Sequence, residues 1–268
     1  MNLKGKVTVV TGAGNGIGAA IARKFAAEGA RVLVSDLDVA AAERVAGEIT
    51  ANGGTAVSKQ ADVTREVDVQ DVVAQAVSEW GPVDLICSNA GAIVEGGVDA
   101  PDDRWTFAFN VNVMAHVYAA RAVLPSMLER GEGYILSTAS AAGLLTSPGA
   151  APYAVSKHGA VALAEWLSVM HGSDGIKVSV ICPQAVDTNM LKGSIEGGNK
   201  ASEEFSKVGK LLTADETADV VVQGVHDETF LILPHPEVLG MVQKKFADED
   251  RWLKGMQKFL ASVVARIA

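Results

Sequence analysis

The chain has few cysteines, two in 268 residues, and each of them lies inside an apolar run. Neither Cys87 nor Cys182 belongs to a pattern with the spacing of a zinc ligand set, and the five histidines show no such spacing either. Two cysteines cannot supply a framework of several disulfides. We therefore expect no metal site, and we expect both thiols to be reduced in a cytoplasmic protein.

Long apolar runs are absent as well, although hydrophobic residues make up 49% of the chain. No stretch approaches the ~20 apolar residues of a membrane-spanning helix, and the first residues lead into a predicted strand without the apolar segment of a signal peptide. Positive charge is in deficit, with 23 Lys and Arg against 32 Asp and Glu, a net charge of −9. The acidic residues are scattered, as on a solvated surface. We therefore expect neither a nucleic acid nor a membrane as partner.

The chain does contain short β-branched apolar runs that alternate with longer segments of helical periodicity. The predicted strands are residues 7–11, 31–35, 56–60, 83–88, 133–137, 177–182 and 229–233. The predicted helices are residues 16–28, 38–51, 67–80, 102–129 and 153–170. Several strands are apolar on both faces, as parallel strands covered by helices are. The alternation predicts an α/β fold: a single doubly wound (Rossmann) domain over residues 1–247, with a mostly parallel seven-stranded sheet and helices on both faces.

Two segments fall outside this alternation. Residues 189–211 are polar and contain glycines, which predicts a lid. Residues 248–268 form an amphipathic helical extension, in which apolar residues recur at helical spacing. These residues are Trp252, Met256, Phe259, Leu260, Val263, Val264 and Ile267. The stripe suits packing against its own domain and packing against another subunit equally well, whereas membrane docking is disfavoured because the opposite face carries both charge signs.

A glycine-rich stretch at residues 11–18, TGAGNGIG, follows the first predicted strand and opens the first predicted helix. Glycines there permit a tight turn and a close approach of the backbone to a pyrophosphate, which the helix N-terminus attracts. Asp36 ends the second predicted strand, where a carboxylate can bind the adenosine ribose hydroxyls and repel a 2′-phosphate. A helix N-cap is the alternative role for Asp36, although Asp38 fits that role equally well. Without a basic residue at 13–17 or directly after Asp36, the pattern favours NAD over NADP.

Tyr153 and Lys157 stand four residues apart in the stretch APYAVSK. Pro152 suits the first turn of a helix, and residues four apart share one helix face. An ammonium group beside a phenol favours the phenolate and lowers the phenol pKa from its ordinary value near about 10. The pair therefore suits an acid–base catalyst near neutral pH. For this spacing alone, an ordinary surface pair is the alternative.

Further motifs stand in the same order along the chain. Asn89-Ala90-Gly91 follows the fourth predicted strand, and Asn112 lies in the fourth predicted helix. Ser140 precedes Tyr153 by thirteen residues, with Ser137 and Thr138 nearby. With these motifs the chain resembles the short-chain dehydrogenase/reductase family over residues 3–233, and Ser140 fits the spacing of that family's catalytic serine better than Ser137 or Thr138.

The resemblance implies a nicotinamide cofactor and a set of residues that bind it. These are Gly12, Asn15, Gly16, Ile17, Gly18, Asp36, Asp62, Val63, Asn89, Ala90, Gly91, Tyr153, Lys157, Pro183, Val186 and Thr188. One departure from the family is Ser88, in place of an asparagine before Asn89. A second is Gln184, where the family usually has a glycine, so the turn after Pro183 is expected to differ and its side chain to project toward the nicotinamide or the substrate.

The resemblance also implies hydride transfer between the nicotinamide and an alcohol or carbonyl carbon. Tyr153 is then the acid–base group, Lys157 lowers its pKa and holds the nicotinamide ribose, and Ser140 donates a hydrogen bond to the substrate oxygen. Asn112 is expected to hold a water molecule that links Lys157 to solvent. Ser140 as a turn cap and Asn112 as a helix kink are the structural alternatives.

The substrate is expected among four residues, Ser140, Ala142, Tyr153 and Gln184. Its walls are predicted at residues 92–95 and 141–145, Pro148 and the lid, which are mainly apolar and contain no arginine. An uncharged, fairly hydrophobic secondary alcohol or ketone fits such walls, unless Lys192, Lys200, Lys207 or Lys210 of the lid points inward. The alternatives are an NADP-dependent carbonyl reductase and a non-catalytic NAD-binding interaction module. By family analogy the two long helices, 102–129 and 153–170, pair subunits into a homotetramer or homodimer.

Overall fold

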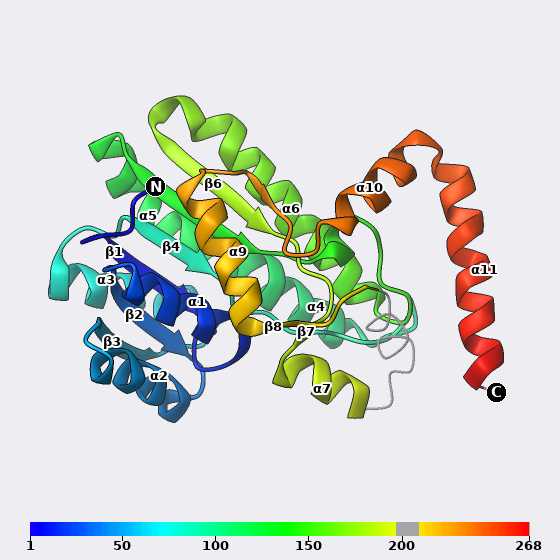
Figure 1. The fold of residues 1–268 in the computed structure, drawn as a ribbon, viewed down its shortest axis with the longest axis horizontal. Helices are drawn as coiled ribbons and strands as arrows, with labels where there is room; N and C mark the ends of the chain where they lie inside the picture. The colour runs from blue at the N-terminus through cyan, green and yellow to red at the C-terminus, as the bar shows by residue number, and fades with distance from the viewer. Residues whose placement is uncertain (197–208, 268) are drawn as a thin grey trace.

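A seven-stranded parallel sheet forms the centre of the molecule (Figure 1). The computed structural model describes residues 1–196 and 209–267, with side chains described up to Ser262. The strands are β1 (Val7–Thr11), β2 (Arg31–Asp36), β3 (Thr55–Gln60), β4 (Leu85–Ser88), β5 (Gly133–Thr138), β6 (Ile176–Ile181) and β9 (Leu231–Ile232). Their order, β3-β2-β1-β4-β5-β6-β9, reverses between β1 and β4. This confirms the predicted doubly wound sheet and puts its switch point at the carboxyl ends of β1 and β4, where such folds bind ligands.

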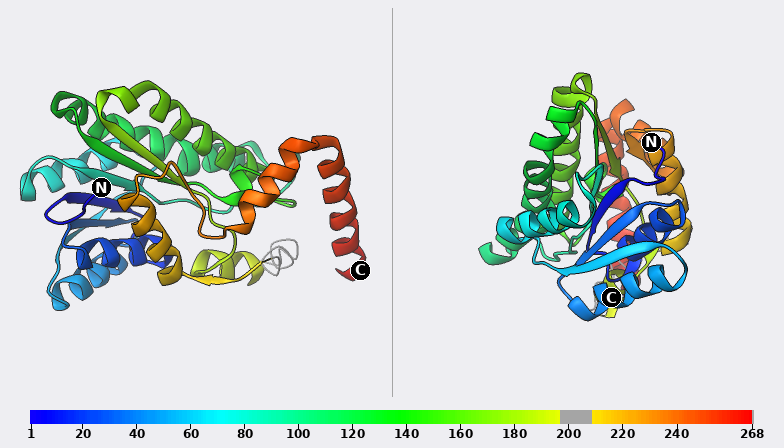
Figure 2. Two further views of the ribbon diagram at one scale, coloured as in Figure 1. Left: turned by 45° about the horizontal axis from the view of Figure 1, so that its top comes forward. Right: turned by 90° about the vertical axis from the view of Figure 1, so that its left-hand side faces the viewer.

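Helices cover both faces of the sheet, as predicted (Figures 1 and 2). One layer holds α1 (Gly16–Ala27), α2 (Val39–Ala51) and α9 (Ala214–His226). The opposite layer holds α3 (Glu66–Trp80), α5 (Ala115–Arg130) and α6 (Ala151–His171). Each layer buries its apolar stripe against one face of the strands, which explains why the strands read as continuous apolar runs.

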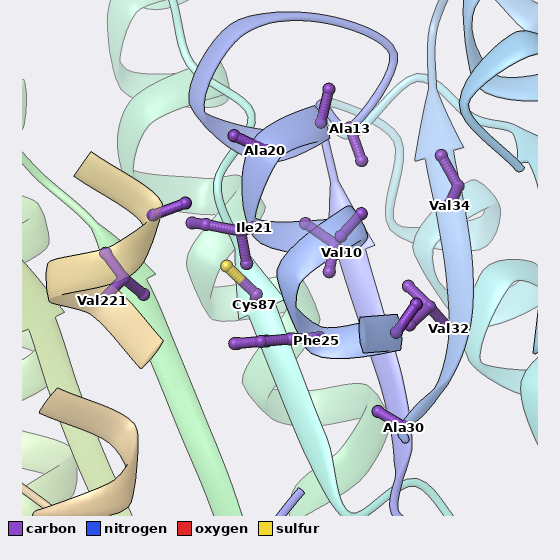
Figure 3. Close-up of a cluster of buried hydrophobic side chains, with 14 of the residues drawn as sticks. Val10, Ala13, Ala20, Ile21, Phe25, Ala30, Val32, Val34, Cys87 and Val221 are labelled. Atoms are coloured by element: carbon purple, nitrogen blue, oxygen red, sulfur yellow. The ribbon is translucent and has the colours of Figure 1, made fainter. Parts of the chain in front are cut away.

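Figure 3 shows the first of these layers packed on β1, β2 and β4. Ile21 and Phe25, four residues apart on α1, project between the strands and α9, where Val221 meets them. Phe25 and Ile21 are fully buried. Because α1 begins at the glycine-rich stretch, this packing also fixes the position of the helix N-terminus at the edge of the sheet.

The predicted helix over residues 102–129 is interrupted. It consists of α4 (Asp102–Phe109), the π-helical turn η1 (Asn110–Met114) and α5. Asn112 lies in the middle of the π turn, and its side chain bonds to the backbone of Ala92 and to Ser156 instead of facing solvent. A π turn inserts one extra residue and redirects the side chains around it. The periodicity alone did not predict this break.

The predicted lid begins with a helix, α7 (Asn189–Glu196), and residues 197–208 of it lie outside the described residues. Its two ends are joined by a small parallel sheet in which β7 (Val186–Asp187) pairs with β8 (Leu212–Thr213). The residues just before and just after the predicted lid therefore lie side by side, near the end of β6.

Two helices follow β9, namely α10 (Glu237–Ala247), which was not predicted, and α11 (Glu249–Ile267). Figures 1 and 2 show α11 standing away from the sheet at the end of α10. In the predicted stripe Trp252, Met256 and Phe259 are half-buried and Leu260 is exposed, whereas the side chains of Val263, Val264 and Ile267 lie outside the described ones. Among the described residues, no helix is long and apolar enough to cross a membrane.

Candidate active site

A cleft of about 460 Å³ lies at the carboxyl ends of the strands, over the switch point between β1 and β4. All of the residues predicted to bind the cofactor line this cleft, from Gly12 and Asp36 at one end to Pro183 and Thr188 at the other. Tyr153, Ser140, Lys157 and Gln184 line it too. The structure thus brings together residues that are far apart in the sequence, and their roles toward a cofactor stay predictions.

The glycine-rich loop fits closely against the loop after β4. Gly12 has a positive φ of 61°, and a Cβ atom on it would lie 2.7 Å from the Ala90 Cα. A Cβ on Gly18 would overlap the Gly12 carbonyl oxygen and the Asn89 amide. Gly16, with a φ of 55°, faces Thr188, because a Cβ there would lie 3.1 Å from the Thr188 Cγ2. Glycine is therefore required at these places by backbone angle and by space.

Asn89 ties the ends of three strands together. Its amide nitrogen donates to the carbonyl oxygens of Thr11 (3.0 Å) and Gly12 (3.2 Å), and its amide oxygen accepts from the Thr138 hydroxyl (3.1 Å). These bonds join β1, β4 and β5 at the floor of the cleft. With both ends of its amide engaged, Asn89 holds the crevice open at a fixed width.

Asp36 points back at the glycine-rich loop. One carboxylate oxygen accepts from the Gly14 N–H (2.8 Å), and the other accepts from the Asp38 N–H (3.0 Å). A Cβ on Gly14 would lie 2.9 Å from the Asp36 carboxylate, so glycine is needed here as well. The N-cap of α2 is Asp38, which accepts from the Ala41 N–H, and not Asp36. Asp36 is therefore free of a capping role and occupies the place expected for a ribose ligand.

Arg44 is a cation near this end of the cleft that the sequence analysis missed. Its guanidinium donates to the Gly14 carbonyl oxygen (2.7 Å) and to the Asn15 side-chain oxygen (3.3 Å), and it pairs with Glu48 (2.8 Å). Arg44 is adjacent in sequence neither to the glycine motif nor to Asp36, where a phosphate-binding cation would be expected. A signal was nevertheless available. The helix predicted after Asp36 runs back alongside the glycine-rich loop, so a cation in its second turn, such as Arg44, can reach that loop.

Tyr153 and Lys157 extend from α6 toward the cleft, as their spacing predicts. The Lys157 ammonium donates to the Thr138 carbonyl oxygen (2.9 Å) and lies 5.9 Å from the centroid of the Tyr153 ring. A Cβ on Gly91 would lie 3.1 Å from this ammonium. Gly91 therefore leaves the space that the lysine occupies, which gives the third residue of Asn-Ala-Gly a physical reason.

Burial governs the ionisation of both groups. It raises the pKa of Tyr153, and a hydrogen bond with Ser140 opposes this in part. Burial also lowers the pKa of Lys157 to about 8. The spacing alone predicted the opposite direction for Tyr153. The difference arises because burial disfavours the phenolate by more than the hydrogen bond from Ser140 favours it.

Ser140 caps a short 3₁₀ turn and also reaches the phenol. Its hydroxyl oxygen accepts from the Ala142 N–H (3.1 Å), and the hydroxyl lies 3.5 Å from the Pro183 carbonyl oxygen. The turn that it caps is η2 (Ala141–Gly143). The capping role and the role toward Tyr153 therefore coexist. Ala142, predicted to contact substrate, does not line the cleft; its N–H orients Ser140 from behind.

Asn112 is fully buried and does not line the cleft. Its oxygen accepts from the Ala92 N–H (3.0 Å), and its nitrogen donates to the Ala92 carbonyl oxygen (3.0 Å) and to the Ser156 hydroxyl (3.0 Å). Both N–H donors are thus used inside the protein. The predicted water bridge to Lys157 therefore needs the second lone pair of the amide oxygen or a main-chain carbonyl.

The substrate end of the cleft is apolar, but its walls differ from the predicted ones. Its apolar lining residues are Ile93, Phe107, Val111, Met190 and Leu191. Residues 141–145 and Pro148 do not line it. Phe107 and Val111 were not predicted, although their spacing of four on one helix face just before Asn112 was an available signal.

The charged residues of the lid turn outward where the structure describes them. Lys192 pairs with Asp187 (2.9 Å) and Lys210 pairs with Glu216 (2.6 Å). Lys200 and Lys207 lie outside the described residues. In residues 1–196 and 209–262, no group of three His, Cys, Asp or Glu side chains could hold a metal ion.

The backbone of Gln184 is not in the left-handed region. Among the described residues other than glycine, only Glu228 has a positive φ. The Gln184 N–H donates to His235 (3.2 Å), and its side-chain nitrogen points at the Met241 sulfur (3.7 Å). The side-chain oxygen is buried without a hydrogen-bond partner among the described residues. The turn therefore accommodates glutamine by packing it toward α10.

Comparison with known proteins gives matches over most of the chain. A sequence profile of the family described as short chain dehydrogenase matches residues 6–198. The 1-deoxy-11-beta-hydroxypentalenate dehydrogenase of Streptomyces exfoliatus is 34% identical over 252 residues, 92% of this chain and 90% of that protein. The meso-2,3-butanediol dehydrogenase of Serratia marcescens is 33% identical over 233 residues, 87% of this chain and 92% of that protein.

Among solved structures, a short chain dehydrogenase/reductase from Burkholderia phymatum in complex with NAD matches with a TM-score of 0.86 and 30% sequence identity. The match covers 93% of this chain and 96% of that chain. All residues predicted for the cofactor and for catalysis fall within residues 6–198, the span of the family profile.

Proposed function

Because the chain belongs to the short-chain dehydrogenase family, we propose that it is an NAD-dependent oxidoreductase acting on an uncharged, fairly hydrophobic secondary alcohol or its ketone. One observation carries the proposal: Tyr153, Ser140 and Lys157 meet in the same cleft that has Asp36 and the glycine-rich loop at its other end. Acid–base groups and a nucleotide-shaped cradle thus share one cavity, as hydride transfer requires.

The residues of the cleft fit a dinucleotide. Gly12, Gly16 and Gly18 permit the tight turn and close packing that bring the backbone to the edge of the cleft, and the N-terminus of α1 offers free N–H groups to phosphates. Asp36 supports NAD over NADP, because its carboxylate suits ribose hydroxyls and repels a phosphate. When bound, NAD supplies the hydride acceptor. Thr188, which faces Gly16, is proposed to contact the nicotinamide end of the cofactor.

The protein's own groups handle the proton. In the oxidation direction the Tyr153 phenolate takes the proton of the alcohol, and the Ser140 hydroxyl donates to the same oxygen as its negative charge develops. The Lys157 ammonium, fixed on the Thr138 carbonyl, favours the phenolate once the charge forms. Positioned groups of this kind each contribute on the order of 10²–10⁴-fold to the rate.

The apolar wall supports the substrate class. Ile93, Phe107 and Val111 face the cleft with Met190 and Leu191, and the described lysines of the lid are paired outside it. Two relatives, the meso-2,3-butanediol dehydrogenase and the 1-deoxy-11-beta-hydroxypentalenate dehydrogenase, are named for the oxidation of alcohols, which supports an alcohol as substrate. A panel of secondary alcohols, followed by NADH absorbance, tests the proposal; no turnover with any of them would contradict it.

Two other functions are separable by experiment. An NADP-dependent carbonyl reductase is favoured by one observation, Arg44 at the ribose end of the cleft. A higher kcat/KM with NADPH than with NADH would establish it. A non-catalytic NAD-binding module is disfavoured by the meeting of Ser140, Tyr153 and Lys157. The Tyr153→Phe variant should bind NADH like the wild type and lose turnover, whereas a module would show no turnover in either form.

The proposed assembly is a homotetramer or homodimer formed through α4–α5 and α6. Large apolar side chains on the outer side of α6 support it, since Trp166 is 55% and Val169 82% exposed. Exposed apolar patches of this kind mark protein–protein contacts. Light scattering measures the mass directly, and a monomer would contradict the proposal. The proposed compartment is the cytoplasm, where the buried, unpaired Cys87 and Cys182 stay reduced.

A further inference from the structure

Helix α10 touches both of the segments that flank Ser140. The Lys245 ammonium donates to the carbonyl oxygens of Leu144 (3.0 Å) and Leu145 (3.2 Å), which follow the turn that Ser140 caps. One helical turn earlier, the Met241 sulfur accepts from the Gln184 side chain (3.7 Å). Residues four apart share one helix face. The same face of α10 thus contacts one segment through Lys245 and the other through Met241.

His235, just before α10, makes a third connection. It is 1% exposed, and its Nδ1 accepts from the Gln184 N–H (3.2 Å). A neutral imidazole that accepts at Nδ1 carries its proton on Nε2, so Nε2 donates to the Lys210 carbonyl oxygen (3.0 Å). The buried His235 side chain therefore joins the Gln184 turn to Lys210, at the end of the predicted lid.

These contacts close a ring around Ser140. At the inner side the two segments meet directly, because the Ala141 N–H donates to the Pro183 carbonyl oxygen (2.9 Å). At the outer side, the contacts among the described residues join them only through α10, by way of Gln184, Met241 and Lys245. Without the contacts through α10, only the Ala141–Pro183 side joins the two segments, and they can move apart on the other side.

Lys245 is suited to this task by its surroundings. Within the described residues no carboxylate pairs with it, and its ammonium lies 5.3 Å from the centroid of the Trp252 ring. Its charge is therefore directed at two backbone carbonyls, and hydrogen bonds from charged donors are stronger than neutral ones. The neighbouring Lys244 is exposed, which makes it a matched control on the same helix.

We propose that Lys245 and His235 are positioning residues for the substrate oxygen. Lys245 acts through α10 to hold the Ser140 segment, and His235, which accepts directly from the Gln184 N–H, holds the Gln184 turn on the other side. The proposal rests on the function proposed above. It adds that the apparent C-terminal appendage is part of the substrate site's support. A site held on both sides tolerates little displacement, because about 1 Å of misplacement costs on the order of 10²-fold in rate.

Lys245→Met tests the outer connection, with Lys244→Met as control and Lys245→Arg as the conservative variant. We expect Lys245→Met to lower kcat/KM for the best alcohol by about 10- to 100-fold, with the NADH dissociation constant unchanged within about twofold. Lys245→Arg, which can still donate to two carbonyls, should recover most of the activity, and Lys244→Met should match the wild type. Equal kinetics of Lys245→Met and Lys244→Met would overturn the proposal.

Hydrogen exchange of the substrate-free protein provides a readout that does not depend on turnover. Lys245→Met should speed exchange in residues 141–146 relative to Lys244→Met, while exchange in β1 and α1 stays unchanged. If no alcohol is turned over but this exchange increases, the function fails and the positioning role stands. If alcohols are turned over and exchange does not change, the positioning role fails and the function stands.

His235 is tested in the same way by two substitutions. His235→Asn keeps a side-chain oxygen that can accept from the Gln184 N–H, whereas His235→Phe has no acceptor. We expect His235→Phe to raise KM and lower kcat for the alcohol, with faster exchange at residues 184–186, and His235→Asn to retain at least about a third of kcat/KM. Equal losses in both variants would show that only the ring's volume matters, and would overturn the role of the hydrogen bond.

Discussion

At the scale of single residues, two ionisable side chains of the candidate site are buried, and burial favours the neutral form of each. Lys157 and Tyr153 are both disfavoured in their charged forms by burial. The folded protein keeps the lysine in place through one hydrogen bond to the Thr138 carbonyl oxygen and through the space left by Gly91. Such residues are retained for activity at a cost in stability. The cost can be measured, because it depends on pH.

Lys157→Met should make the protein more stable at pH 7 while abolishing turnover. Below about pH 8 the lysine is protonated in the folded and the unfolded protein, so folding carries the full cost of burying the ammonium. From about 8 up to the ordinary value of 10.5 the folded protein loses this proton first, and the cost falls. The free energy of unfolding in urea should therefore rise by on the order of 1–3 kcal/mol at pH 7, and by less at pH 10.

The control for this measurement is Lys244→Met, which removes an exposed lysine and should change stability by less than about 1 kcal/mol at either pH. A loss of stability in Lys157→Met at pH 7, or a gain that does not shrink toward pH 10, would contradict the assigned cost of burial.

Asp36 and Arg44 make opposite contributions to the choice of cofactor. Asp36→Ala removes the carboxylate that repels a 2′-phosphate and leaves the guanidinium of Arg44 beside the Gly14 carbonyl. We expect the ratio of kcat/KM with NADPH to that with NADH to rise at least about tenfold, a change of about 1.4 kcal/mol. The double variant Asp36→Ala, Arg44→Ala should lose most of this gain. An unchanged ratio in the single variant would remove Asp36 from cofactor discrimination.

At the scale of helices and strands, the pattern of apolar residues determined most of what could be predicted. The β-branched runs predict all seven strands of the central sheet with small shifts at their ends, because parallel strands covered by helices on both faces are apolar along most of their length. The break at η1 could not be predicted in this way, since it depends on Asn112 meeting Ala92, a contact between segments distant in sequence. The function of α10 could not be predicted in this way either, because it depends on contacts with Leu144 and Gln184, which are distant in sequence.

The candidate site follows the same division. Motif spacing brought together the residues proposed for the cofactor and for catalysis, all of which except Asn112 line one cleft. It did not indicate Phe107, which lines the cleft, or Arg44 and His235, which contact residues of the cleft from segments whose orientation is fixed only by packing. Ala142 does not line the cleft, because a residue two positions after Ser140 can turn either into the cleft or behind it.

Helix α1 should be the most sensitive element of the cofactor half. Phe25→Ala removes a fully buried ring from between the sheet and α9 (Figure 3). We expect a loss of about 3–5 kcal/mol in the free energy of unfolding, together with weaker NADH binding, because the helix also carries Gly16 and Gly18. Val220→Ala on α9, where the valine is 37% exposed, is the control and should cost less than about 1 kcal/mol. Similar losses in both variants would contradict the packing described.

At the scale of the whole molecule, the sheet and its two helix layers form one unit, and α11 extends beyond it (Figure 2). A chain that ends at Ala247 keeps α10 and Lys245 and loses Trp252. We expect its melting temperature to stay within a few degrees of the wild type, about 1 kcal/mol or less, with unchanged NADH binding. Light scattering on the same sample decides whether the stripe on α11 joins subunits: a smaller mass shows that it does, and an equal mass shows that it does not.

The reversal of strand order has a consequence for synthesis of the chain. β1 pairs with β4, and the floor of the cleft needs Asn89 from beyond β4, whereas its roof needs Thr188, which faces Gly16. A nascent chain on the ribosome therefore has no complete nucleotide pocket until most of its length has emerged. Dinucleotide can stabilise only molecules that bind it. The cofactor proposed above would thus protect finished copies from proteases and leave prematurely terminated ones exposed.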